Sequence, residues 1–191
     1  TFDYAYQPVI SGRTVYFGNS VDCCIYALDR KSGKIRWTYY TDAPVRFAPL
    51  IYRKKLYASS DDGFIYCLKS ASGKLIWKKC GGPKQDLILG NERMMSRWPA
   101  RGGIVIKNNV LYGGAGIWPS EKIYIFALDP KNGNIIWQND SCGEKEMPQP
   151  HGGAVAKSGI SAQGYFAVGG DKLFIPTGRA VPAAMNIETG S

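Results

Sequence analysis

Residues 27–37 read Ala-Leu-Asp-Arg-Lys-Ser-Gly-Lys-Ile-Arg-Trp, and residues 67–77 repeat the phrase as Cys-Leu-Lys-Ser-Ala-Ser-Gly-Lys-Leu-Ile-Trp. A third copy at 127–137 reads Ala-Leu-Asp-Pro-Lys-Asn-Gly-Asn-Ile-Ile-Trp, and residues 184–190 begin a fourth. The first two copies lie 40 residues apart. A period of about 40 residues is typical of a propeller blade, in which four short strands bury one face against the next blade.

Each copy of the phrase sits within a run of short apolar segments that alternate with period two, which predicts strands. We expect an all-β chain of four-stranded blades and no helix of ten residues. The predicted blades span about 8–40, 48–79, 103–139 and, lacking its fourth strand, 165–191, with insertions at about 81–102 and 141–164. A closed ring typically needs about four to eight blades. The sequence therefore predicts an incomplete ring, which is either a piece of a longer propeller or half of a ring that a homodimer completes.

The repeated phrase also predicts a turn and a contact between blades. Asp29 and Asp129 are placed to accept hydrogen bonds from backbone N–H groups two residues on. The glycines Gly33, Gly73 and Gly133 supply the positive φ that such a turn needs. We expect the tryptophan four residues after each glycine to pack across to a neighbouring blade, which gives Trp37, Trp77 and Trp137 a structural role.

The pattern Ala-x-Asp-x-x-Ser/Thr-Gly-Lys-x-x-Trp resembles the tryptophan-docking motif of the propellers that are similar to pyrroloquinoline-quinone (PQQ) enzymes. The resemblance covers about residues 8–190, with Lys69 in place of the Asp and Asn134 in place of the Lys. That family includes the quinoprotein alcohol dehydrogenases and the non-catalytic propellers of outer-membrane assembly lipoproteins. The resemblance implies a periplasmic or secreted protein. It also implies about seven or eight blades in one chain, which favours a fragment over a homodimer.

Composition argues against several kinds of chemistry. The chain has 191 residues, five cysteines and a single histidine, His151. No Cys-x-x-Cys pair suggests a zinc site, and nothing places a nucleophile against the histidine. No apolar run reaches the length of a membrane span. We therefore predict no catalytic residue and no metal site.

The strand order sorts the connections onto two faces. The turns that follow the first and third strands of each blade form one face, called here the turn face. It holds many of the lysines and arginines behind the net charge of +9. Such a surface can attract anionic lipid headgroups, but no aromatic residues interleave with the lysines, which argues against nucleic acid. A membrane-surface or nucleic-acid role through this face is one alternative for the function.

The remaining connections, including both insertions, form the opposite face, called here the loop-rich face. Long loops on a rigid scaffold are where binding usually occurs. We expect a protein partner or a small anionic ligand there, because a guanidinium forks onto carboxylate or phosphate oxygens. The candidate ligand-binding residues are Tyr6, Arg46, Trp98, Arg101, Trp118, His151 and Arg179.

The adjacent pair Cys23 and Cys24 raises an enzymatic alternative, because quinoprotein alcohol dehydrogenases carry a vicinal disulfide over PQQ. The resemblance then implies PQQ with calcium as cofactors. The calcium ligands and the catalytic Asp of those enzymes have no convincing counterparts in this chain. The sequence therefore favours a non-enzymatic binding or scaffold module without a cofactor, and a fragment of a PQQ-dependent dehydrogenase is the alternative.

Overall fold

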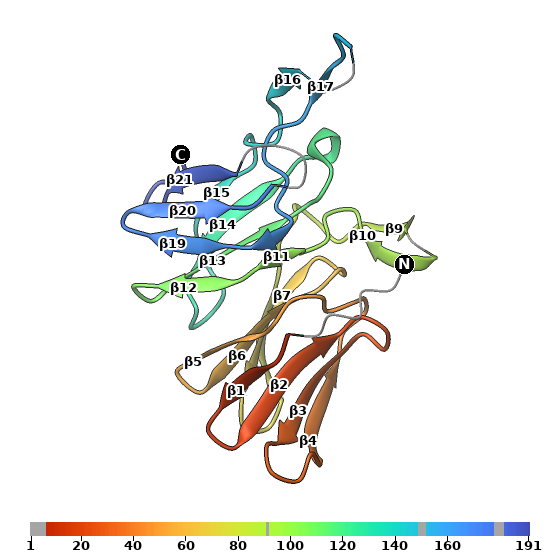
Figure 1. Cartoon of the computed structure of the whole chain (residues 1–191), viewed down its shortest axis with the longest axis vertical. Coiled ribbons are helices and arrows are strands. Elements are labelled where there is room, and N and C mark those ends of the chain that lie inside the picture. The colour runs from red at the N-terminus through yellow and green to blue at the C-terminus, as the bar shows by residue number, and fades with distance from the viewer. Residues whose placement is uncertain (1–6, 91, 149–151, 178–181) are drawn as a thin grey trace.

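The computed structural model describes residues 7–90, 92–148, 152–177 and 182–191, and it is almost entirely β-structure (Figure 1). Three four-stranded sheets and one three-stranded sheet follow one another along the chain, and in each sheet neighbouring strands are consecutive in sequence. The described residues contain one helical element, η1(Pro119–Glu121), which is a single 3-10 turn. The architecture agrees with the predicted series of blades.

The first two sheets are antiparallel meanders, each with a register shift between its third and fourth strands. The strands of blade 1 are β1(Val9–Ser11), β2(Thr14–Asn19), β3(Cys24–Asp29) and β4(Ile35–Tyr40). The strands of blade 2 are β5(Leu50–Tyr52), β6(Lys55–Ser59), β7(Phe64–Lys69) and β8(Leu75–Cys80).

The third and fourth sheets repeat this plan, the fourth with three strands. The strands of blade 3 are β12(Val105–Lys107), β13(Val110–Ala115), β14(Tyr124–Leu128) and β15(Ile135–Asn139). The strands of blade 4 are β19(Ala167–Gly169), β20(Lys172–Ile175) and β21(Ala183–Asn186).

Both insertions contain a hairpin, which the sequence did not predict. The first is β9(Leu87–Gly90) with β10(Arg93–Ser96), and the second is β16(Glu146–Pro148) with β17(Val155–Lys157). The segments that lead into blades 3 and 4 also form a short parallel pair, β11(Gly102–Gly103) with β18(Gly164–Tyr165).

The repeated turn forms in all four blades, and the same hydrogen bond closes it each time. The glycine N–H donates to the carbonyl four residues earlier, at 2.8–2.9 Å, in the turns that end at Gly33, Gly73, Gly133 and Gly190. All four glycines have φ between +68° and +76°. The Asp29 carboxylate accepts from the Lys31 N–H at 3.0 Å, and Asp129 accepts from Lys131 at 2.8 Å. The predicted aspartate hydrogen bonds are thus present.

A tryptophan from each four-stranded blade packs onto the turn of the following blade. A Cβ built on Gly73 would lie 2.6 Å from the Trp37 ring, and one built on Gly133 would lie 2.8 Å from the Trp77 ring. The indole N–H of Trp37 donates to the Ser70 carbonyl at 2.9 Å. Trp77 and Trp137 donate to Pro130 and Ile187 in the same way, at 3.4 and 2.9 Å. These contacts leave no room for a side chain on the glycines.

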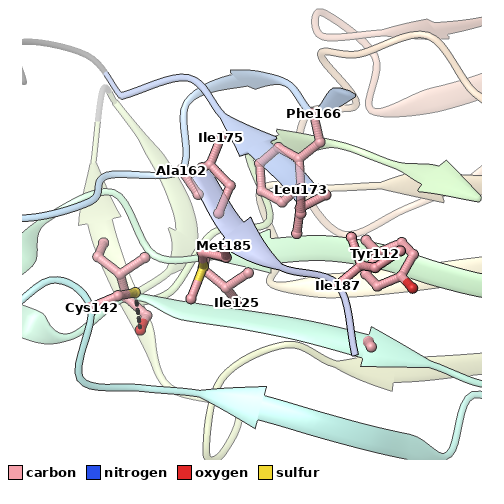
Figure 2. Close-up of a cluster of buried hydrophobic side chains, with 11 residues drawn as sticks. Tyr112, Ile125, Cys142, Ala162, Phe166, Leu173, Ile175, Met185 and Ile187 are labelled. Atoms are coloured by element: carbon pink, nitrogen blue, oxygen red, sulfur yellow. Dashed lines mark hydrogen bonds between the residues drawn. The ribbon is translucent and has the colours of Figure 1, made fainter. Parts of the chain in front are cut away.

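Apolar side chains fill the space between successive blades in three clusters. Figure 2 shows the cluster between blades 3 and 4, where Tyr112 and Ile125 face Leu173 and Met185. A tyrosine of the second strand takes part in each cluster, at Tyr16, Tyr57 and Tyr112, and lies about 6 Å from the tryptophan of its own blade. The blades are therefore joined by three copies of one packing arrangement.

One contact links blades that are not neighbours in sequence. The Phe47 ring, in the loop before β5, meets the Tyr165 ring edge-on with centroids 5.0 Å apart. The Tyr165 hydroxyl also accepts a hydrogen bond from the Ala48 N–H at 2.8 Å. Tyr165 leads into blade 4, so this contact joins the start of blade 2 to the start of blade 4.

Candidate functional site

The loop-rich face carries the irregular parts of the molecule. In Figure 1 the β9–β10 hairpin lies on the right, opposite the β5–β6, β12–β13 and β19–β20 turns on the left, and the β16–β17 hairpin extends to the top of the view. This separation matches the two faces predicted from strand order. The loop-rich face is therefore where the candidate site is built.

The centre of the candidate site is Asp61, which sequence analysis missed. Its side chain is only 2% exposed, although it lies in the β6–β7 loop. The Arg46 Nε donates to Asp61 Oδ2 at 2.7 Å. Arg101 adds a forked contact, with Nε 2.9 Å from Oδ1 and Nη2 2.8 Å from Oδ2. Two of the predicted arginines thus converge on one buried carboxylate, because a buried charge needs charged, hydrogen-bonded partners.

The backbone holds Asp61 in place from both sides. Its N–H donates to the Pro44 carbonyl and its carbonyl accepts from the Ser96 N–H, both at 2.9 Å. Pro44 precedes Arg46 and Ser96 ends the β10 strand. Three separate segments therefore meet at this carboxylate, and the two guanidinium groups that it binds have defined positions.

A third arginine, Arg93, lines the same pocket and was also missed. The pocket is formed by Arg46, Asp61, Arg93, Met95 and Arg101, with Pro44 and Gly90. Arg93 Nη1 donates to the Ser20 and Val21 carbonyls, both at 2.9 Å, so the β10 strand is tied to the β2–β3 loop of blade 1. The charges lining the pocket are three guanidinium groups and one carboxylate.

The neighbouring Asp62 has a different role. Its side chain is buried and accepts hydrogen bonds from the Phe64 N–H at 2.9 Å and the Tyr66 hydroxyl at 2.6 Å. Burial raises the pKa of this carboxyl, against the lowering effect of those hydrogen bonds. Blade 1 repeats the pair four residues apart, since the Tyr26 hydroxyl donates to Asp22. The Asp62 pair therefore stabilises the loop that presents Asp61.

Of the remaining predicted ligand-binding residues, the two that the structure describes, Trp98 and Trp118, do not line this pocket. Trp98 is buried, packs edge-on against Tyr124 and donates its indole N–H to the Glu121 carbonyl, so its ring is part of the core between blades 2 and 3. Trp118 is exposed beside η1. Tyr6, His151 and Arg179 lie outside the described residues.

Cys23 and Cys24 are both free thiols in the structure, so the vicinal disulfide stays a prediction. Cys23 has a φ of +55°, and its carbonyl accepts from both the N–H and the hydroxyl of Thr41. Arg93 Nη1 lies 3.8 Å from the Cys23 sulfur. Burial raises the Cys23 pKa more than this arginine lowers it.

The β9–β10 hairpin exposes an apolar strip beside the pocket. Met94 is paired directly across from Leu89, and Leu87 is two residues from Leu89 on the same face. Leu89 is 75% exposed, Met94 52% and Leu87 46%. Met95, on the other face of the hairpin, is buried and lines the arginine pocket. Both faces of this short hairpin are thus apolar, which is unusual for a surface element.

Several basic residues of the turn face have structural partners. Lys55 Nζ donates to the Pro130 and Lys131 carbonyls of the next blade, both at 3.2 Å, and Lys107 donates to the Gly170 carbonyl. Arg53 donates to the Asn109 side chain at 3.1 Å. Part of the positive charge on this face therefore joins neighbouring turns.

The sequence of this chain matches a known protein family. The family model described as outer membrane protein assembly factor BamB matches residues 3–146, about three quarters of the chain. The chain belongs to this PQQ-like repeat family. Its blades are therefore PQQ-like repeats, as the resemblance implied.

Curated relatives of the family show that its members differ in activity. The chain is 26% identical over 137 residues to the tetrathionate hydrolase of Acidithiobacillus ferrooxidans, covering 71% of this chain and 23% of the relative. It is 27% identical over 140 residues to the quinoprotein ethanol dehydrogenase of Pseudomonas aeruginosa, covering 69% and 22%. The chain thus spans less than a quarter of the length of either relative.

Solved structures of the family share the fold. BamB from Moraxella catarrhalis superposes with a TM-score of 0.65 and 18% identity, covering 94% of this chain and 48% of that one. The quinohemoprotein alcohol dehydrogenase from Comamonas testosteroni gives 0.73 and 17%, covering 97% and 33%. These likenesses confirm the predicted propeller fold, and the chain spans about half of the BamB chain and a third of the dehydrogenase chain.

The described residues contain no group of three or more His, Cys, Asp or Glu side chains that is placed to hold a metal ion. The arginine pocket has a volume of only about 10 Å³, which is close to the room that one water needs. A fused-ring cofactor therefore does not fit into that pocket as it stands.

Proposed function

We propose that this chain is part of a non-enzymatic PQQ-like propeller that holds a protein partner on its loop-rich face. The observation that carries the proposal is the exposed strip of Leu87, Leu89 and Met94 on the β9–β10 hairpin. An apolar strip beside charged groups is a common feature of protein interaction sites, because its burial releases water from apolar surface.

The surroundings of the strip support a binding surface that is preformed. Arg93 fastens the hairpin to blade 1, and the Arg97 guanidinium binds Asp86 at 3.0 Å and Glu121 at 3.2 Å at its base. A surface that is held in place before binding loses less conformational entropy when the partner arrives. The description of the matched family as an assembly factor is in keeping with a protein partner.

The compartment proposed for this role is the periplasm or the exterior of the cell. The family resemblance favours that location. As a separate finding, the described residues contain no helix that is long and apolar enough to cross a membrane.

The experiment is affinity capture with quantitative mass spectrometry, comparing the wild type with the double variant Leu89→Ser and Met94→Ser. We expect the double variant to lose the captured partner by at least tenfold. The matched control is Ile136→Ser, which removes an exposed apolar side chain from β15 and is expected to keep the partner. Equal capture by the double variant and the wild type would contradict the proposal.

A second candidate function is a fragment of a PQQ-dependent dehydrogenase. The similarity to the quinoprotein ethanol dehydrogenase favours it, and so does the Cys23–Cys24 pair on the loop-rich face. Its test is titration with PQQ and calcium, followed by dye reduction with ethanol as substrate. Saturable PQQ binding with ethanol-dependent bleaching of the dye would support this candidate over the scaffold.

A further inference from the structure

The pocket on the loop-rich face combines an excess of positive charge with unused hydrogen-bond donors. Its lining holds the guanidinium groups of Arg46, Arg93 and Arg101 against the single carboxylate of Asp61, an excess of two positive charges. Like charges that are gathered around a pocket repel one another, so the arrangement gains from a bound anion.

The donor count of the three arginines shows where an anion would bind. Each guanidinium carries five N–H donors. Arg46 uses only its Nε, on Asp61. Arg93 uses only its Nη1, on the Ser20 and Val21 carbonyls and the Cys23 sulfur. Arg101 uses Nε and Nη2, on Asp61. Within the part of the chain that the structure describes, both Nη groups of Arg46, the Nε and Nη2 of Arg93 and the Nη1 of Arg101 have no protein acceptor.

Asp61 also explains why these donors are held in place rather than spread by repulsion. It is almost fully buried, its backbone is bonded on both sides, and it binds Arg46 and Arg101 at 2.7–2.9 Å. Arg93 is fixed separately by two carbonyls of blade 1. A forked guanidinium that is already positioned matches the two oxygens of a carboxylate or phosphate.

We propose that this pocket binds an oxyanion, a carboxylate or phosphate group, through the free donors of Arg46, Arg93 and Arg101. The volume of about 10 Å³ holds little more than one water-sized group. The pocket thus takes the oxygens of the anionic group, and the remainder of the ligand stays outside it. This inference rests on the proposed function, because the anionic group belongs to the partner or ligand that binds the loop-rich face.

The experiment is isothermal titration of the purified chain with two probes at constant ionic strength. N-acetyl-aspartate amide represents the acidic side chain of a protein partner, and inorganic phosphate represents a free anion. We expect saturable binding of at least one probe with a Kd in the millimolar range, and potassium chloride alone gives no saturable heat. Tighter binding of the aspartate derivative assigns the pocket to a partner side chain, and tighter binding of phosphate assigns it to a free anion.

The variant that tests the site is Arg93→Gln, because Arg93 does not touch Asp61 and its loss leaves that buried carboxylate paired. We expect a loss of affinity of at least tenfold, with partial recovery in Arg93→Lys, which keeps the charge. The matched control is Arg53→Gln on the turn face, whose affinity should equal that of the wild type. Absence of saturable binding in the wild type, or equal affinity in Arg93→Gln, would overturn the proposal.

The two proposals fail separately. The Leu89→Ser and Met94→Ser variant removes the apolar strip but keeps the three arginines, so it should bind the small probe normally even if it loses the partner. Partner capture that survives in this variant counts against the proposed function alone. Absence of probe binding to the wild type counts against the oxyanion site alone.

Discussion

The turn face of this molecule is built from a repeated contact, whereas the loop-rich face is built from contacts that are not repeated. The turn face repeats one local arrangement, a glycine turn that receives the tryptophan of the blade before it. On the loop-rich face, the Asp61 cluster joins loops of blades 1, 2 and 3 and has no copy elsewhere among the described residues. The comparison indicates that the repeated contacts stabilise the fold, while the unrepeated ones are free to serve binding.

The variant Trp77→Ala tests most strongly whether the repeated contacts stabilise the fold. Trp77 packs between blades 2 and 3, against Gly133 and the Pro130 carbonyl. Removing a large, mostly buried aromatic side chain typically costs about 3–5 kcal/mol of unfolding free energy. Chemical denaturation measures this change. Trp118→Ala, which removes an exposed tryptophan from the loop-rich face, is the control and should change stability by less than about 0.5 kcal/mol.

The arginines of the loop-rich face provide the second test. Arg101→Ala leaves the Asp61 carboxylate buried with only Arg46 as its charged partner, so we expect a loss of about 2–3 kcal/mol in thermal or chemical unfolding. Sequence analysis treats Arg101 only as a candidate ligand-binding residue, and the contact with Asp61 adds a structural role. Arg53→Gln on the turn face breaks one exposed hydrogen bond to Asn109 and should cost less than about 1 kcal/mol. An equally stable Arg101→Ala variant would show that the buried pair contributes little.

Two glycine substitutions separate backbone strain from the tryptophan contact within the turn face. Gly33 and Gly73 have nearly the same φ, +68° and +71°, so replacement by alanine should strain both backbones by about 1 kcal/mol. A Cβ at Gly73 would also meet the Trp37 ring at 2.6 Å, whereas one at Gly33 meets no described atom within 4 Å. Gly73→Ala should therefore lose about 1–3 kcal/mol more than Gly33→Ala when both are unfolded with urea. Equal losses would show that the ring moves aside without penalty.

The smallest expected effect is a pH dependence from Asp62. Burial raises its pKa in the folded state, so folding favours the protonated form. The resulting stabilisation is full below the ordinary Asp range near pH 4 and is lost as the pH rises through the raised value. Asp62→Asn removes this dependence. Unfolding midpoints of both proteins between pH 4 and 7 should show the variant gaining on the wild type as pH rises, and parallel curves would contradict this.

How far the sequence predicts this molecule depends on how local each feature is. The strands Cys24–Asp29, Ile35–Tyr40 and Phe64–Lys69 lie within the predicted blades 8–40 and 48–79, because alternation of apolar side chains decides strand formation locally. The β9–β10 hairpin was missed because Leu87, Ile88 and Leu89 do not alternate with polar residues. Its pairing becomes understandable only when one face lines a pocket and the other is available to a partner.

The candidate site was predictable only in part. Arg46 and Arg101 were selected because both precede the first strand of a blade and can therefore approach the same axis. Asp61 lies in Ser-Ser-Asp-Asp-Gly, which reads as an ordinary exposed turn. Its burial comes from segments 15 residues before it and 40 residues after it. Two adjacent acidic residues in a loop of a strongly basic chain are the one signal that would have singled it out.

The contact between Phe47 and Tyr165 has a consequence for how the molecule unfolds. An array whose units touch only their neighbours can lose an end unit alone, and its unfolding broadens into steps. Here the start of blade 4 is also fastened to the start of blade 2, through the two rings and through the hydrogen bond from Ala48. Blade 4 therefore cannot separate without disturbing two other blades, and this link favours a single cooperative transition. Tyr165 thereby couples the unfolding of blade 4 to that of blade 2.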